Sequence, residues 1–280
     1  MQSAMSFQTA LTEAFSSRTG KYLLLAKRVE VKEPDTVHDF RVASRRLLVV
    51  APLFSLVGKS KKWRRQTRRQ ARDFNLLRDL QVLQASMAVD PYLYQLAGRQ
   101  IKSEQDMLQD RFSGFPDNNY CHALDKLNTQ LAQLFQLAPW QVITSLHQAW
   151  LKSCSLARQA LSQVEPLEAK SLHRLRVRLK GLRYLLELMA DTHLPIEINI
   201  QAFKGWQDKL GQLSDMDFAI TWLQAYAPDN PQRITLAQAA QQLALQISLE
   251  SAQVDRLIKT SETQVSTCLA NLVLHYSTGE

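Results

Sequence analysis

Glycine is scarce in this chain and proline occurs at wide intervals, and this feature constrains the fold more than any other. Only 8 of the 280 residues are glycine, well below the usual share of about 7%. The 9 prolines separate stretches rich in Leu, Ala, Gln and Arg, which are good helix formers. A sheet protein would show more glycine and more β-branched alternation. The sequence therefore predicts an all-α protein.

Apolar spacing and the proline positions predict nine helices. Their expected ranges are 6–31, 36–57, 60–88, 91–112, 118–137, 139–164, 168–191, 197–226 and 231–276. Asp35 is the expected N-cap of the second helix and Asp229 that of the last. Pro52 should kink its helix, and Gly211 should bend the eighth. The prolines that suit a first helical turn are Pro91, Pro139 and Pro231.

Several classes of protein are disfavoured by the same sequence. The longest strongly apolar run, 47–57, contains Pro52 and is shorter than the roughly 20 residues of a membrane-spanning helix. The first 14 residues lack the basic and apolar regions of a secretory signal. The three cysteines have no C-x-x-C spacing, which favours small apolar residues in a reducing compartment over a disulfide framework or a zinc site. We expect a soluble cytoplasmic protein without a metal or cofactor.

Positive charge is concentrated in two segments. The whole chain has 34 Lys and Arg against 26 Asp and Glu, a net charge of +8. Residues 38–72 contain eleven basic residues and one acid, a net of +10, and residues 171–184 contain five basic residues and no acid. The remainder therefore carries 8 − 15 = −7. Such concentration favours the capture of anions and destabilises the chain when no anion is bound.

The two basic segments belong to an internal repeat. Both contain the pattern His-x-x-Arg-Val-x-x-basic, beginning at His38 and at His173. A second shared pattern follows in each half, with Asp79 lying 41 residues after the first histidine and Asp215 lying 42 after the second. Two matches in the same order and at one separation predict two related helical halves about a pseudo-twofold axis, at about 6–137 and 139–276 of a single domain over 6–276.

Helical spacing gathers the basic side chains of each repeat on one face. At 100° per residue, His38, Arg41 and Arg45 fall within about 60°, with Arg46 to one side. Solvated helix faces normally interleave acids at i,i+4, because like charges at that spacing destabilise a helix. Arg outnumbers Lys by 8 to 3 in the first segment and 4 to 1 in the second, and its planar fork suits bidentate contacts with phosphate. Both faces are predicted to bind an anion.

The second stripe consists of His173, Arg176, Lys180 and Arg183, and Glu187 continues it. On the opposite side of that helix the sequence predicts an apolar seam made of Leu175, Leu179, Leu182 and Leu186. The two repeated histidines are interpreted as hydrogen-bond donors to phosphate. Neighbouring cations should lower their pKa, and a bound polyanion should raise it. The aspartates interpreted as arginine-orienting partners or local caps, and not as catalytic bases, are Asp79, Asp215 and Asp217.

These motifs resemble the CHAD family, the conserved histidine α-helical domain. The resemblance rests on His38-x-x-Arg41-Val42-x-x-Arg45-Arg46, Arg78-Asp79-Leu80-x-Val82, His173-x-x-Arg176-x-x-x-Lys180-x-x-Arg183-Tyr184-x-x-Glu187 and Leu210-Gly211-x-x-x-Asp215, and it spans residues 6–276. Asn75 stands where the family often has glycine, and the Glu-x-Glu-x-Lys signature of an attached triphosphate-processing domain does not occur.

The resemblance implies two four-helix bundles with pseudo-twofold symmetry around a basic central pore or groove that binds inorganic polyphosphate. The binding residues implied are His38, Arg41, Arg45, Arg46, His173, Arg176, Lys180 and Arg183, with Arg65, Arg68, Arg69, Arg72 and Lys204 as additional lining. No catalytic residue and no cofactor is implied. The expected partners are polyphosphate itself, polyphosphate granules and a polyphosphate-metabolising enzyme, with no membrane.

Two other functions remain as alternatives. A nucleic-acid-binding protein would use the same basic helices, but the aromatic residues of the basic segments form no stacking platform or recognition module. A phosphohydrolase or kinase would need a P-loop or metal-organising carboxylates, and neither pattern is found. The sequence therefore favours non-enzymatic binding of polyphosphate.

Overall fold

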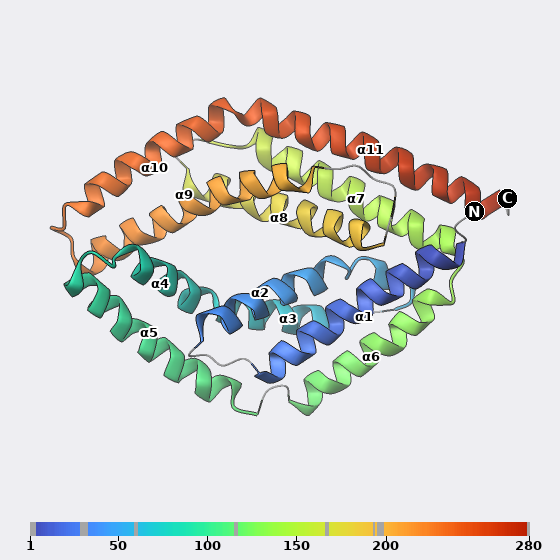
Figure 1. Ribbon diagram of the computed structural model, residues 1–280, viewed down its shortest axis with the longest axis horizontal. Coiled ribbons are helices and arrows are strands. Elements are labelled where there is room, and N and C mark those ends of the chain that lie inside the picture. The colour runs from blue at the N-terminus through green and yellow to red at the C-terminus, as the bar shows by residue number, and fades with distance from the viewer. Residues whose placement is uncertain are drawn as a thin grey trace. The chain divides into compact units, whose positions relative to one another are not determined.

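The computed structural model describes residues 4–28, 33–58, 61–114, 117–165, 168–192, 194 and 199–278, and in this part of the chain every regular element is a helix (Figure 1). The prediction of an all-α protein is confirmed. The expected helical positions 29–31, 60, 197 and 198 lie outside the described residues.

The chain divides into two compact units. The first unit contains the described residues up to Leu146, together with Asp191, Thr192 and the end of the chain from Val273. The second unit contains residues 147–190 and 194–272. The chain passes from one unit to the other inside three helices, after residues 146, 190 and 272, and once more between residues 192 and 194.

The first unit is built from six α-helices and one short 3-10 helix among its described residues. They are α1 (Ala4–Arg28), α2 (Pro34–Val49), η1 (Leu53–Leu56), α3 (Lys61–Asp73), α4 (Asn75–Ser86), α5 (Pro91–Phe112) and α6 (Asn118–Phe135). Helix α2 packs against α1, α3 and α4, and α4 also packs against α5.

The second unit contains most of α7, α8 and α11 and all of α9 and α10. Their bounds are α7 (Pro139–Ser162), α8 (Ala169–Asp191), α9 (Ile200–Tyr226), α10 (Gln232–Leu249) and α11 (Ser251–Thr278). Its core includes the leucines at 175, 179, 182 and 186 of α8, all of which are buried. The apolar seam predicted for this helix is therefore confirmed. Helix α9 packs on α8, where Gln207 Nε2 donates to the Leu179 carbonyl oxygen at 2.9 Å.

Aromatic side chains fill the core of the first unit. Phe40 of α2 packs against Tyr22 of α1, with ring centroids 5.5 Å apart, and against Phe74, at 5.3 Å. Phe54 of η1 lies edge-on to Trp63 of α3 at 5.8 Å. Edge-to-face pairs of this kind are worth about 0.5–1.5 kcal/mol beyond their buried area. Because the aromatic residues of the basic segment lie in this core, they are not presented to bases.

Helix α3 is held to the first unit by a buried hydrogen-bond network in addition to Trp63. Tyr22 donates to Gln70 Oε1 at 2.9 Å, and the hydroxyls of Thr67 and Tyr120 lie 2.9 Å apart. The Tyr120 hydroxyl donates in turn to that of Tyr22. Burial raises the pKa of Tyr120 to about 12, and it raises that of Tyr22 as well. Both phenols are therefore neutral donors, and they fix which face of α3 points inward.

Two expected N-caps are wrong. The N-cap of α2 is Glu33, which makes no side-chain cap, and Pro34 occupies the first turn, so Asp35 lies inside the helix. The N-cap of α10 is Pro231, immediately before the first helical residue, and not Asp229. The Asn230 side chain accepts from the Gln232 N–H instead.

Helix punctuation agrees with the sequence in some places and departs from it in others. Helix α5 has the predicted range, because Asp90 accepts from the backbone of the first turn and Pro91 follows it. Helix α2 ends at Val49, and Pro52 is the N-cap of the separate helix η1, so it does not kink a continuous helix as expected. The expected helices 60–88 and 231–276 are each split, at Phe74 and at Glu250. Helix α9 by contrast runs unbroken through Gly211.

Candidate functional site

The first predicted stripe lies along α2 of the first unit. His38 is exposed, and Arg41 and Arg45 are half-buried, whereas Val37, Phe40 and Leu47 face the core. This separation follows from the 3.6-residue period, which puts positions 38, 41 and 45 on one side of the helix. The structure therefore brings His38, Arg41 and Arg45 together as the sequence predicts.

Helix α4 completes this stripe. Arg41 Nη2 donates to Asn75 Oδ1 at 2.9 Å, and one turn further along α4 Arg78 acts electrostatically on His38. His38 of α2 is therefore matched with Arg78 of α4, and Arg41, three residues later on α2, is matched with Asn75, three residues earlier on α4. This order is expected for two antiparallel helices. We call His38, Arg41, Arg45, Asn75 and Arg78 the α2–α4 cluster.

The electrostatics of the α2–α4 cluster disfavour further positive charge. Partial burial lowers the pKa of His38, and the charges of Arg78, Arg41 and Arg45 lower it further, while Asp39 acts in the opposite direction. The lowered pKa predicted for this histidine is therefore confirmed, although burial is the largest cause. At neutral pH the ring is uncharged and still donates one hydrogen bond. A bound anion would stabilise the protonated form.

Helix α3 carries a second basic surface. Trp63, Thr67 and Gln70 are buried, and the arginines occupy the remaining arc of about 140°. The members of this α3 arginine face are Arg64, Arg65, Arg68, Arg69 and Arg72. The last four are exposed, and Arg64 is half-buried, with a pKa lowered by burial and by the charge of Arg68.

Arg46 lies beside Arg45 on α2 and is half-buried. Its backbone carbonyl oxygen accepts from Nη1 of Arg18, at 3.4 Å, and Arg18 Nη2 also donates to Asp191 at 2.8 Å. Arg18 is itself buried. The backbone at Arg46 is thus hydrogen-bonded to α1, whereas the side chain of Arg41 contacts α4.

The second predicted stripe lies along α8 of the second unit. His173 is exposed, and Arg176, Lys180 and Arg183 are half-buried. The Arg183 guanidinium lies 3.6 Å from the Glu187 carboxylate and 4.9 Å from the ring centroid of Tyr184. Glu187 therefore neutralises part of the charge at the C-terminal end of this stripe.

Arg176 occupies the position in the second unit that Arg41 occupies in the first. A Cβ atom at Gly211 of α9 would lie 3.7 Å from Nη2 of Arg176 and 3.9 Å from its Nε. The arginine three residues after the histidine thus reaches, in each unit, the residue four positions before the aspartate of the second pattern. In the first unit that residue is Asn75, and in the second it is Gly211.

The two lysines of α9 differ in their surroundings. Lys204, a predicted binding residue, is exposed. Lys209 Nζ lies 2.6 Å from the Glu250 carboxylate and 4.9 Å from the ring centroid of Trp206. Lys209 is therefore committed to a contact with the junction of α10 and α11.

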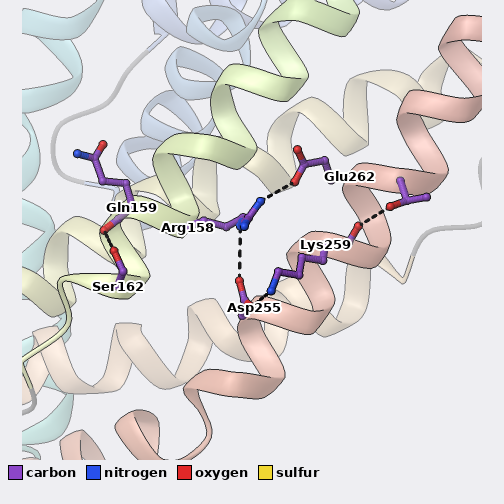
Figure 2. Close-up of polar contacts among 7 residues, drawn as sticks. Arg158, Gln159, Ser162, Asp255, Lys259 and Glu262 are labelled. Carbon is purple, nitrogen blue, oxygen red and sulfur yellow. Dashed lines mark hydrogen bonds and ion pairs between the residues drawn. The ribbon is translucent and has the colours of Figure 1, made fainter.

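Carboxylates of α11 form ion pairs with basic residues of α7 and of α11 itself. Arg158 of α7 lies 3.6 Å from Asp255 and 3.5 Å from Glu262, and Lys259 Nζ lies 2.5 Å from Asp255, as Figure 2 shows. The network joins α7 to α11 on the surface of the second unit.

The three aspartates singled out from the sequence have different environments. Asp79 and Asp217 are half-buried, and Asp215 is exposed. Burial raises the pKa of Asp217. Their interpretation as arginine-orienting groups stays a prediction.

Sequence reasoning omitted two arginines from the predicted binding set. Arg78 lies in the Arg78-Asp79-Leu80-x-Val82 motif, and its position directly before Asp79 was the only signal available for it. Its approach to His38 depends on the packing of α4 against α2, which no local pattern encodes. Arg64 lies on the α3 arginine face, and its Nε is buried without a hydrogen-bond partner.

The structure also bears on metals and membranes. Within the described residues, no three His, Cys, Asp or Glu side chains gather as a metal site would require. Cys154 is buried, and Cys121 and Cys268 are half-buried, so only the first fits the expected buried apolar role fully. None of the helices described is long and apolar enough to cross a membrane.

The fold and these clusters define an all-helical protein that carries arginine-rich faces in each of two units. The family model of the CHAD domain matches residues 14–224, more than half of the chain. The chain therefore belongs to the CHAD family, and the resemblance seen in its motifs is confirmed.

A solved structure supports the fold. The crystal structure of the CHAD domain from the plant Ricinus communis matches with a TM-score of 0.59 and 22% sequence identity, over 90% of this chain and 91% of that one. None of the curated proteins compared with this chain matches it.

Proposed function

We propose that this protein binds inorganic polyphosphate through its arginine-rich helix faces and does not hydrolyse it. The observation that carries the proposal is the α2–α4 cluster, in which Arg41 is held by Asn75 and the charges of Arg78, Arg41 and Arg45 act on His38, whose pKa is lowered first by burial and further by these charges. Repulsion among these groups is relieved when an anion binds between them. Membership of the CHAD family adds support, because the family resemblance implies this ligand.

A long polyanion fits these faces better than a single phosphate. The α3 arginine face presents four exposed arginines along one helix, and a helix rises about 1.5 Å per residue, so the arginines extend over about 10 Å. An isolated phosphate contacts only one or two such groups, whereas a phosphate chain contacts several in succession. Each contact releases counterions, so affinity should fall steeply with salt.

Thermal unfolding with two ligands tests chain recognition. Long-chain polyphosphate should raise the melting temperature of the protein much more than orthophosphate at the same total phosphate concentration. Equal shifts would contradict the proposal. Competition with DNA and RNA belongs in the same experiment, because displacement of polyphosphate at a lower phosphate concentration would favour nucleic acid as the ligand.

Substitutions in each unit test whether both stripes take part. Arg41→Ala in the first unit and Arg176→Ala in the second should each lower affinity and reduce the slope of log K against log salt by about one. The matched control is Lys152→Ala, an exposed residue of α7 outside the basic segments. The shared basic pore implied by the family resemblance requires both stripes to contact one chain. An effect of only one of the two arginine substitutions would contradict that part of the proposal.

The absence of catalysis is also part of the proposal. Incubation of the protein with polyphosphate and magnesium should release no orthophosphate above a blank. Release that disappears in Arg41→Ala and Arg176→Ala would identify a phosphohydrolase instead. As a binding protein, the chain would act in the cytoplasm at polyphosphate granules or beside an enzyme of polyphosphate metabolism.

A further inference from the structure

The break between α3 and α4 places an uncharged polar side chain in the basic cluster of the first unit. Helix α3 ends at Asp73 and α4 begins at Asn75, and Phe74 between them is buried against Phe40 and Phe112. The aromatic ring anchors the junction in the core. The following residue, Asn75, is half-buried beside Arg41 of α2.

Hydrogen-bond chemistry determines the orientation of the Asn75 amide. A guanidinium has donors and no acceptor, so the atom of Asn75 that lies 2.9 Å from Arg41 Nη2 must be the carbonyl oxygen. The amide nitrogen, with its two N–H groups, then points away from that guanidinium. The arginines of the α2–α4 cluster offer it no acceptor. An anion bound to the cluster does.

The second unit has no side chain at the corresponding position. Gly211 lies four residues before Asp215, as Asn75 lies four residues before Asp79. The guanidinium of Arg176 lies over Gly211, and a Cβ added to Gly211 would be in ordinary van der Waals contact with it. The two units therefore present equivalent arginines with different neighbours, an amide in the first and bare backbone in the second.

We propose that Asn75 is a ligand-binding residue of the first unit that also positions Arg41. Its Oδ1 holds the guanidinium, and its Nδ2 donates to an oxygen of the phosphate group that the same guanidinium contacts. This inference rests on the proposed function, since the phosphate belongs to the bound polyphosphate chain. It assigns to the first unit a neutral donor that adds affinity without adding charge.

The salt dependence of binding separates this role from a purely electrostatic one. Asn75→Ala should weaken polyphosphate binding about tenfold, the scale of one hydrogen bond to a charged group. The slope of log K against log salt should not change, because no charge is removed. Arg41→Ala should weaken binding and also reduce that slope by about one. Asn75→Asp should reduce both as well, because its carboxylate neutralises Arg41 and cannot donate.

Asn118→Ala is the matched control. Asn118 is exposed and lies at the first position of α6 in the same unit. Asn75 is half-buried and lies at the first position of α4. The affinity of Asn118→Ala for polyphosphate should stay within twofold of that of the parent protein. Affinity within twofold for Asn75→Ala, together with weakened Arg41→Ala, would overturn the inference and leave the proposed function intact. Failure of the parent protein to prefer polyphosphate over orthophosphate would instead overturn the proposed function.

A spectroscopic measurement on the parent protein does not depend on the stability of any variant. With ¹⁵N-labelled asparagine, the side-chain amide signal of Asn75 is identified by its loss in Asn75→Ala or Asn75→Asp. Adding polyphosphate should shift this signal and leave that of Asn118 in place. An unshifted Asn75 signal under saturating polyphosphate would also overturn the inference.

Discussion

Removal of one arginine from the α3 arginine face should stabilise the ligand-free protein. Arg68 is exposed, so Arg68→Gln removes little buried contact. It has Arg64 four residues before it, Arg65 three residues before it and Arg72 four residues after it. Electrostatic coupling to Arg64 is evident in the lowered pKa of that guanidinium. The backbone carbonyl of residue 68, which accepts from Arg72 Nε at 3.3 Å, is retained.

The size of the effect follows from these neighbours. Each like-charge pair at i,i+3 or i,i+4 destabilises a helix by about 0.2–0.5 kcal/mol. Three pairs give a gain of about 1 kcal/mol when Arg68 is neutralised, and Gln and Arg have nearly equal helix propensities. The gain should disappear at high salt, because the Debye length falls from about 30 Å at 0.01 M to about 3 Å at 1 M.

Urea denaturation at low and high salt measures this effect, and hydrogen exchange of the amides of α3 locates it. Lys152→Gln is the control, because Lys152 has no charged residue three or four positions away, and it should change stability at neither salt concentration. The same Arg68→Gln protein should bind polyphosphate more weakly than its parent. A loss of stability at low salt, or a gain that persists at 1 M salt, would refute the role assigned to like-charge repulsion.

Three further predictions concern single residues. Arg45→Ala and Lys180→Ala should each weaken polyphosphate binding in a titration while leaving or raising the melting temperature of the free protein; a large drop would show that these side chains are structural ion-pair partners. His38 has a lowered pKa, so as the pH falls below about 6.5 the unfolded chain takes up the proton first and the free protein loses stability, a loss that His38→Gln should remove. Because a bound polyanion raises that pKa, affinity should increase between about pH 7.5 and 5.5 more in the parent protein than in His38→Gln, and parallel pH profiles would contradict this. Thr67→Val leaves the Tyr120 hydroxyl with one partner fewer and should cost about 1–3 kcal/mol in urea denaturation, whereas an unchanged midpoint would mean that this network does not hold α3.

Local signals in the sequence were enough to predict much of the helical structure. Helix α5 was predicted to the residue, with Pro91 in its first turn, and the structure adds a side-chain cap from Asp90. The leucine seam of α8 was equally predictable, since a 3.6-residue period identifies a buried face without knowledge of the partner helix. For the same reason, spacing alone placed His38, Arg41 and Arg45 on one face.

Features that depend on contacts between distant residues could not be predicted in this way. The interruption at Phe74 has neither glycine nor proline, and it coincides with the burial of that ring against Phe40 and Phe112. Gly211, where a bend was expected, does not interrupt α9, and whether the helix bends there stays a prediction. Gly211 is buried, and the Arg176 guanidinium lies 3.7 Å from the position that its Cβ would take.

The two lysines of α9 differ in the structure, where Lys204 is exposed and Lys209 is paired with a carboxylate. Lys209 contacts the Glu250 carboxylate, and this hydrogen bond lowers the pKa of Glu250, whose Oε1 accepts from Gln246 Nε2 at 2.7 Å. Lys209→Ala should therefore weaken the α10–α11 junction while leaving polyphosphate affinity unchanged, and Lys204→Ala should do the reverse. Because the pKa of Glu250 is lowered on folding, its contribution to stability is present above the ordinary pKa of a glutamate and is lost as the pH falls through the lowered value. The stability difference between Lys209→Ala and its parent should accordingly shrink in acid. If Lys209→Ala bound polyphosphate more weakly, and its stability depended on pH as that of the parent does, then Lys209 would belong to the binding face.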